Sequence, residues 1–173
     1  MHFLNKLLIT FVFTLTYSTF SVANSTAVPD EQQPINIQAD SLNASERDGK
    51  SVYKGNVVVT QGSLTLKGEQ IEVIHPKGSL SKAITTGNPA TFKRYNTDEK
   101  SWVNGKASTI EYNTQSKTVL LIGNAEVEQP GKHLITGPKL FYDMQKQTLS
   151  AESTPQEKKR VSVTFTPDSS KQK

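Results

Sequence analysis

Apolar and polar residues alternate along the chain in short runs that are punctuated by glycine. The run Gly55–Val73 reads GNVVVTQGSLTLKGEQIEV, with Gly62 and Gly68 between its apolar stretches. Alternation with a period of two places the apolar side chains on one face of extended backbone, and glycine favours turns. The pattern therefore predicts three short strands within these nineteen residues.

The same pattern returns later in the chain. The stretch Gly123–Tyr142 repeats that of Gly55, with Pro130 as an extra residue in its first turn, and Gly-Asn pairs stand at Gly55, Gly87 and Gly123. Internal repeats of this length are typical of stacked or wound units that cannot bury their apolar faces alone. The sequence predicts an internal duplication built from strand meanders.

The rest of the chain also consists of short β segments and turn signals. Turn residues lie at Asp48-Gly49, His75–Gly78, Asn96–Lys100 and Asn113–Lys117. No window of eleven or more residues has a sustained helical apolar stripe. The fold class predicted is all-β, with a core between sheets or within a barrel.

Such a chain must protect or use the edges of its sheet. The outermost segments in sequence are Ile35–Ile37 and Val161–Phe165. These two segments either pair with each other and close the fold, or remain open and pair with neighbouring chains by strand addition. The candidate assembly edges are Ile35, Asn36, Ile37, Val161, Ser162, Val163, Thr164 and Phe165.

The chain divides into four parts. Residues 1–23 have Lys6, an apolar run and a Ser-Val-Ala end, a pattern typical of a cleavable signal peptide, with an uncleaved membrane anchor as the alternative. Residues 24–33 are a polar, flexible leader, 34–166 a single β domain, and 167–173 a polar tail. The chain is therefore expected to be exported.

Composition excludes several kinds of chemistry. The chain has no cysteine, and His75 and His133 do not form a ligand cluster, so neither thiol catalysis nor a zinc site is expected. Nucleotide-binding and nucleophile-elbow motifs are absent, and the net charge of +4 is scattered, which does not point to nucleic acid. The carboxylates Glu72, Glu111, Glu126 and Glu128 occupy outward positions of alternating strands. We expect no enzyme activity, cofactor or metal.

The inward positions are the informative ones, and they allow two interpretations. One is a packed, dry core, as in a structural or adhesive module that binds carbohydrate or protein. The other is a groove between two sheets that accepts an acyl chain, gaining about 0.8 kcal/mol per buried CH₂. The candidate groove residues are Ile35, Ile37, Val57, Val59, Leu64, Leu66, Ile71, Val73, Phe92, Ile110, Tyr112, Leu121, Leu134, Leu140 and Tyr142.

An ordered series of motifs resembles one known family. The motifs are QPINIQAD, YKGNVVVTQGSLTLKGEQIEV, GNPATF, ASTIEY, LIGNAEVEQPG and ITGPKLFYD, running from about Pro34 to Phe165. Together they resemble the OstA-like family of periplasmic lipopolysaccharide-transport proteins of Gram-negative bacteria. The resemblance implies a slightly twisted, open β-jellyroll of about sixteen strands. It also implies that Ile35, Phe92 and Tyr112 line the groove.

The resemblance further implies a non-catalytic bridge. In that family lipopolysaccharide passes from an inner-membrane-anchored partner to the N-terminal domain of an outer-membrane translocon, and molecules stack head to tail. Lipid A carries phosphates, so basic side chains near the groove are candidate contacts. These are Lys93, Arg94, Lys158, Lys159 and Arg160, which are otherwise solvated turn residues.

Overall fold

The computed structural model describes residues 28–153 and 160–167. Two single turns of 3-10 helix accompany ten strands in the described part of the chain. The elements are η1 (Asp30–Gln32), β1 (Asn36–Gln38), β2 (Ser41–Ser45), β3 (Lys50–Gln61), β4 (Leu64–Ile74), η2 (Pro76–Gly78), β5 (Lys82–Asn96), β6 (Ser101–Asn113), β7 (Thr118–Gln129), β8 (His133–Asp143), β9 (Thr148–Glu152) and β10 (Ser162–Phe165). None of the helices found among these residues is long and apolar enough to cross a membrane.

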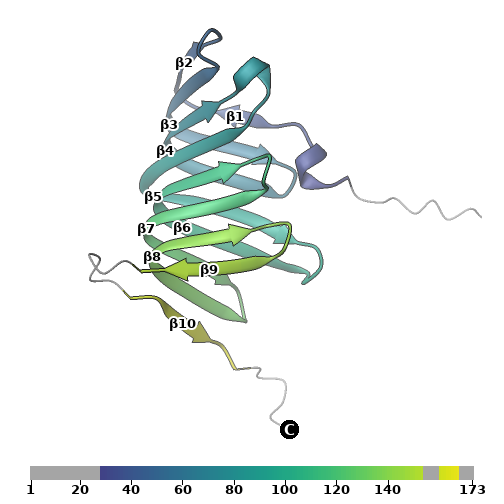
Figure 1. The fold of residues 1–173 in the computed structure, drawn as a ribbon, viewed down its shortest axis with the longest axis vertical. Coiled ribbons are helices and arrows are strands. Elements are labelled where there is room, and N and C mark those ends of the chain that lie inside the picture. The colour runs from purple at the N-terminus through teal and green to yellow at the C-terminus, as the bar shows by residue number, and fades with distance from the viewer. Residues whose placement is uncertain (1–27, 154–159, 168–173) are drawn as a thin grey trace, which may run out of the picture.

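All the strands belong to one antiparallel sheet. Its order is β1-β3-β4-β5-β6-β7-β8-β10, with β2 also paired to β3 and β9 also paired to β8. The strands stack along the long axis of the molecule, with β2 and β3 near one end and β10 at the other (Figure 1). The two outermost segments in sequence are thus far apart and do not pair with each other.

Each long strand bends near its middle. The pairing register shifts between Lys54 and Val57 where β3 meets β4, and a corresponding shift occurs at every later pair up to β7 and β8. Gly55 and Gly123 stand at two of these bends with φ of 79° and 78°, and the asparagine that follows each also has positive φ. Glycine adopts this backbone region without steric cost. The Gly-Asn pairs are therefore part of a line of bends across the sheet.

The bends divide the sheet into two halves that face each other. Arm 1 contains β2, β9 and the half-strands that end at the turns 46–49, 75–81, 114–117 and 144–147. Arm 2 contains β1, β10 and the half-strands that end at the turns 62–63, 97–100 and 130–132. We call the side where both sets of turns lie, opposite the bends, the mouth.

The fold class is an open, all-β jellyroll, but the strand count of about sixteen is wrong, since residues 28–153 and 160–167 form ten. The alternation pattern predicts that a strand ends at Gly68, because glycine favours turns. Pairing continues on both sides of each bend, so the two halves remain one strand. Counting each half of the six long strands separately would give sixteen.

The core lies between the two arms. The Phe92 ring of arm 2 meets the Tyr142 ring of arm 1 edge-on, with centroids 6.4 Å apart. A Cβ placed on Gly105 of arm 2 would lie 2.9 Å from Leu121 Cδ2 of arm 1. Both contacts join arm 2 to arm 1, and the first joins β5 to β8, which are not neighbours in the sheet, so the inner faces pack against each other.

The outer face carries the carboxylates, as predicted. Glu72, Glu111 and Glu126 form ion pairs with Lys50, Lys82 and Lys106 at 2.7, 3.1 and 2.9 Å, and Glu128 is exposed. Exposed pairs of this kind contribute little to stability, roughly 0–1 kcal/mol each. They mark this face as the solvated one.

One polar group of the inner face lacks a partner. Thr85 is fully buried, and its hydroxyl has no hydrogen-bond partner among the described residues. We predict that Thr85→Val stabilises the domain by about 1–2 kcal/mol, because the desolvated hydroxyl is replaced by a methyl group. Urea unfolding measures the change, with Thr86→Val on the outer face as the matched control. A loss of stability for Thr85→Val alone would contradict this account.

Candidate functional site: the interior and its mouth

The predicted groove residues meet in the interior. Twelve of them are buried in the core: Val57, Val59, Leu64, Leu66, Ile71, Val73, Phe92, Ile110, Tyr112, Leu121, Leu140 and Tyr142. Ile35 and Ile37 are partly buried and pack against this core. Alternation thus identified the inner face correctly for these fourteen residues. Whether they contact a lipid stays a prediction.

Leu134 is the exception. It lies opposite Glu128 and Thr164 and stays outside the core, whereas its neighbour Ile135 packs against the core and pairs with buried Val127. The inward placement of Leu134 is therefore wrong. In His133–Asp143 the bend near Gly137 changes the phase, so alternation counted back from Leu140 reaches Leu134 instead of Ile135.

Small inner-face residues were missed. Ala90, Ala107 and Ala125 are almost fully buried and lie close to the bends, where the two arms approach each other. Alanine is too weakly hydrophobic to stand out in an alternating pattern. Their position next to the Gly-Asn repeats was the available signal, because a sharp bend leaves room only for small side chains.

Tyr112 and Tyr142 place their rings in the apolar core. Burial raises the pKa of Tyr112 and of Tyr142, so both phenols remain neutral near pH 7. The Tyr112 hydroxyl donates to Gln61 Oε1 at 3.5 Å, which links arm 1 to arm 2 close to the mouth. These two tyrosines therefore add no charge to the interior.

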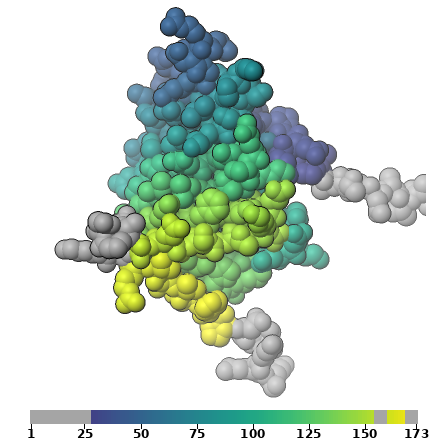
Figure 2. Space-filling view, viewed as in Figure 1, coloured from purple at the N-terminus to yellow at the C-terminus, as the bar shows by residue number. Residues whose placement is uncertain are grey.

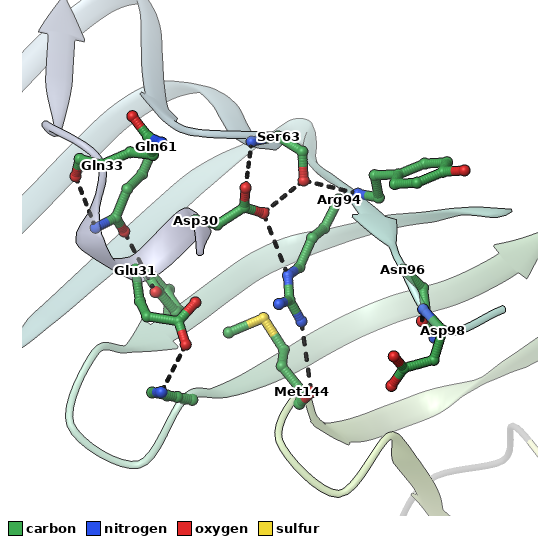
Figure 3. Close-up of polar contacts among 12 residues, drawn as sticks. Asp30, Glu31, Gln33, Gln61, Ser63, Arg94, Asn96, Asp98 and Met144 are labelled. Carbon is green, nitrogen blue, oxygen red and sulfur yellow. Dashed lines mark hydrogen bonds and ion pairs between the residues drawn. The ribbon is translucent and has the colours of Figure 1, made fainter. Parts of the chain in front are cut away.

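A polar cavity of about 270 Å³ lies at the mouth. The residues that line it include Arg94, Lys117, Met144, Gln145 and Gln147, together with Asp30 and Glu31 from the N-terminal segment. Arg94 Nη1 donates to the Met144 carbonyl at 3.4 Å, and Asn96 Nδ2 donates to Gln147 Oε1 at 3.1 Å. Both contacts cross from arm 2 to arm 1, and Figure 3 shows the one between Arg94 and Met144.

The basic candidates separate into different places. Arg94 follows the inward phase of Phe92 and faces the mouth, whereas the Lys93 ammonium lies over the Trp102 ring, 4.2 Å from its centroid, beside a cavity of the outer face. Arg160 is exposed beside Gly137. Lys158 and Lys159 lie outside the described residues, as do 1–27 and the tail beyond Pro167. Only Arg94 adjoins the interior among the described candidates.

The described part of the expected flexible leader makes specific contacts. Residues 30–32 form η1, which lies beside the hairpin turns on the flank of the stacked strands (Figures 1 and 2). A polar stretch with one proline is typical of a linker, and nothing in it indicates a partner more than thirty residues away. The sequence pattern therefore did not predict that Asp30 and Glu31 belong to the mouth.

His75 and His133 lie apart and have different neighbours. His75 Nε2 shares a hydrogen bond with Ser51 Oγ at 2.8 Å, and the His133 ring lies 6.4 Å from that of Phe165. Within the described ranges no group of three or more His, Asp or Glu side chains is placed to hold a metal ion.

The predicted edge segments form the two ends of the sheet in arm 2, whereas β2 and β9 form its ends in arm 1. β1 pairs only its residues 36–38 with β3, and β10 pairs residues 162–165 with β8. In β10, Val163 and Phe165 are 45% and 75% exposed. The prediction that these edges assemble stays untested.

Comparison with known proteins places this architecture in a family. Residues 36–148 match the family model described as "LptA/(LptD N-terminal domain) LPS transport protein". The chain belongs to this family. The match spans both copies of the repeat and all the long strands, so it covers most of the interior and the turns at the mouth but not Asp30 and Glu31.

Similar proteins of this LptA/LptD N-terminal family come from several bacteria. The lipopolysaccharide export system protein LptH of Pseudomonas aeruginosa is 34% identical over 87% of this chain and 85% of its own length. LptA of Escherichia coli K12 is 30% identical over 94% of this chain and 87% of its own. The crystal structure of LptH, described as the periplasmic LptA-homologous component of the lipopolysaccharide transport device, superposes with a TM-score of 0.74 and 31% identity, covering 80% of this chain and 99% of that one.

Proposed function

We propose that this chain is a non-catalytic periplasmic bridge that binds lipopolysaccharide. In this proposal the acyl chains lie between the two arms, and the lipid moves from an inner-membrane export complex to the outer-membrane translocon. The proposal rests on family membership and on one observation above all: both arms contribute apolar side chains to a single interior that continues along the stacked strands.

The interior is closed in this structure, so binding requires the arms to separate. Leu66, Ile110, Leu121 and Leu140 are fully buried. Separation exposes apolar surface at roughly 25 cal/mol per Å², and an acyl chain that fills the space offsets this cost. The Gly-Asn pairs at the bends and the polar mouth are compatible with such an opening.

The free edges support assembly into a longer bridge. β1 and β10 stand at opposite ends of the sheet, so a second copy can pair β10 of one molecule with the β1 end of the next. Pairing of this kind is heterologous and continues in one direction, which would align the interiors of successive molecules. The N-terminal domain of the translocon and the anchored partner would then extend the same sheet.

The complete burial of the inner face favours a second candidate. A structural or adhesive module with a dry core would have the same packing and would bind carbohydrate or protein on its outer face. The two candidates differ in whether a lipid ever contacts the inner face.

Site-specific photocrosslinking distinguishes them. Purified residues 24–173 carry a photoreactive residue at Phe92 or Tyr112, with Glu111 on the outer face as the control, and are mixed with lipopolysaccharide. Crosslinks at both inner positions and none at Glu111 are expected. Absence of crosslinks at all three, in folded protein with lipid in excess, would overturn the proposal and favour the dry-core module.

Adjacent cations on opposite faces provide a charge test. We predict that Arg94→Glu weakens lipopolysaccharide capture by about tenfold or more in low salt and by less in high salt, because it removes a cation at the mouth that can pair with phosphate. Lys93→Glu changes the net charge equally but lies over Trp102, so capture should stay near the wild-type value. Equal losses for both variants, measured by filter binding across salt concentrations, would contradict a role specific to the mouth.

A further inference from the structure

We propose that residues 28–33, which we call the strap, are an internal plug that closes the mouth and must leave before a lipid enters. Its carboxylates Asp30 and Glu31 occupy the positions that the phosphates of an anionic amphiphile would take at Arg94 and Lys117. This inference rests on the proposed lipid-binding function and adds a mechanism that controls access to the interior.

Asp30 attaches the strap to arm 2. Its carboxylate accepts hydrogen bonds from the Ser63 amide at 2.8 Å and from the Ser63 hydroxyl, and it lies 3.5 Å from Arg94 Nε (Figure 3). The Ser63 hydroxyl in turn accepts from the Tyr95 amide at 3.0 Å. One aspartate is thus held by the β3–β4 turn and by the end of the inner face of β5.

Glu31 attaches the strap to arm 1. Its carboxylate pairs with Lys117 Nζ at 2.7 Å, in the turn between β6 and β7. The hydrogen bond from Lys117 is the main reason that the pKa of Glu31 lies below its usual value, so the pair is charged at neutral pH. Neighbouring residues of the strap therefore hold opposite arms, and separation of the arms must break at least one of these contacts.

A third contact joins the strap to the interior. The Gln33 carbonyl accepts from Gln61 Nε2 at 3.2 Å, and the same buried side chain accepts from the Tyr112 hydroxyl through Oε1. Gln61 thereby connects the end of the strap to an inner-face residue of arm 1. Release of the strap would leave this buried amide without one partner. Partial release is therefore costly, and we expect the strap either to be fully bound or to be replaced by the ligand.

The chemistry of the mouth matches an anionic headgroup that carries an apolar tail. Arg94 and Lys117 are about one quarter and one third exposed, which screens their charges less than those of surface lysines. Arg94 presents a planar set of N–H donors suited to phosphate. Leu64 and Tyr112 line the same cavity and lead to the core. A phosphate can therefore replace a carboxylate at the cations while the tail replaces inner-face contacts.

The strap should lower the apparent affinity without changing the site beneath it. If the open state is populated to a fraction f, the apparent dissociation constant is the intrinsic one divided by f. Weakening the strap raises f and tightens binding. Fixing the strap in place lowers f towards zero and blocks binding.

Two complementary variants test this exchange. In Asp30→Asn with Glu31→Gln the strap loses its charges, and we expect lipopolysaccharide crosslinking at Phe92 to reach half-saturation at a concentration at least about fivefold lower. The matched control is Glu69→Gln with Glu128→Gln, two exposed carboxylates whose neutralisation changes the net charge equally. The control should bind as the wild type does.

In the second variant, Asp30→Cys with Ser63→Cys creates the only two thiols of the chain, because the sequence contains no cysteine. Oxidation joins the strap to the β3–β4 turn. The oxidised protein should lose crosslinking at Phe92, and reduction should restore it to at least the wild-type level.

The outcomes separate the two proposals. If the wild type, the neutralised strap and the reduced cysteine variant all fail to crosslink at Phe92, the lipid-binding function itself is wrong. If the wild type crosslinks but neither strap neutralisation nor the disulfide changes the binding curve, the function stands and the strap mechanism is overturned. An equal gain in the Glu69/Glu128 control would assign the effect to net charge and also overturn the mechanism.

Discussion

Gly55→Ala should destabilise the domain by about 3 kcal/mol, about twice the effect of the same change at Gly131. Both glycines have φ close to +78°, so alanine incurs a similar backbone cost of roughly 1–2 kcal/mol at each. At Gly131 a Cβ meets nothing within 4 Å, whereas at Gly55 it would lie 2.2 Å from Asp40 Oδ2 and 2.9 Å from Asp40 Cβ. The additional loss comes from this overlap, at about 1–3 kcal/mol.

The overlap also affects the junction between β1 and β2. The Asp40 amide donates to the carbonyls of Lys54 and Gly55, and its carboxylate accepts from Asn56 Nδ2 at 3.0 Å. A displaced Asp40 therefore weakens the attachment of the N-terminal edge to the bend of β3. Chemical unfolding of both variants and the wild type measures the difference. Equal destabilisation at the two positions would show that the bend tolerates a side chain, contrary to the structure.

The bends explain which features of the fold could be predicted from the sequence. Alternation gives the phase of a half-strand directly, so Val57 and Val59 were placed on the inner face correctly. Glycine gives an ambiguous signal, because positive φ serves both a hairpin turn and a bend within a strand. Gly62 is a turn and Gly55 is a bend, with φ of 58° and 79°. Only the register of the neighbouring strand distinguishes them, and that is a non-local property.

The mouth was less predictable for a related reason. Asp30 is bound by Ser63 and Arg94, which lie in two other hairpins. Each of the three is a residue type that is common on protein surfaces, so none of them stands out in the sequence. Lys93 and Arg94 were grouped because they are adjacent in sequence. Adjacent residues of a strand point to opposite faces, so only one of them reaches the interior. Alternation along each strand predicts which residues belong to the inner face. The contacts that close the mouth join separate hairpins, so the sequence pattern does not predict them.

If assembly uses β10 as proposed above, Val163→Pro should weaken self-association by about tenfold or more while leaving the fold intact. Along a strand the backbone N–H groups point alternately to the two sides. The Thr166 amide donates to the Lys132 carbonyl, on the side of β8. Thr164 therefore also faces β8, and the amides of Val163 and Phe165 face the free edge. Proline at 163 removes a donor that the chain itself does not use and places a ring where a neighbouring strand would pair.

Two variants of the same strand isolate this effect. Val163→Ala loses the half-exposed side chain but keeps the N–H group, so its self-association should weaken less than that of Val163→Pro. Thr164→Pro removes the amide on the side of β8 and should detach β10 and lower stability as well. Light scattering over a range of concentrations measures assembly, and urea unfolding measures stability. A missing donor and a ring clash together correspond to about 1.4 kcal/mol or more, which is the tenfold change expected. Unchanged large species with Val163→Pro would show that assembly uses a surface other than β10.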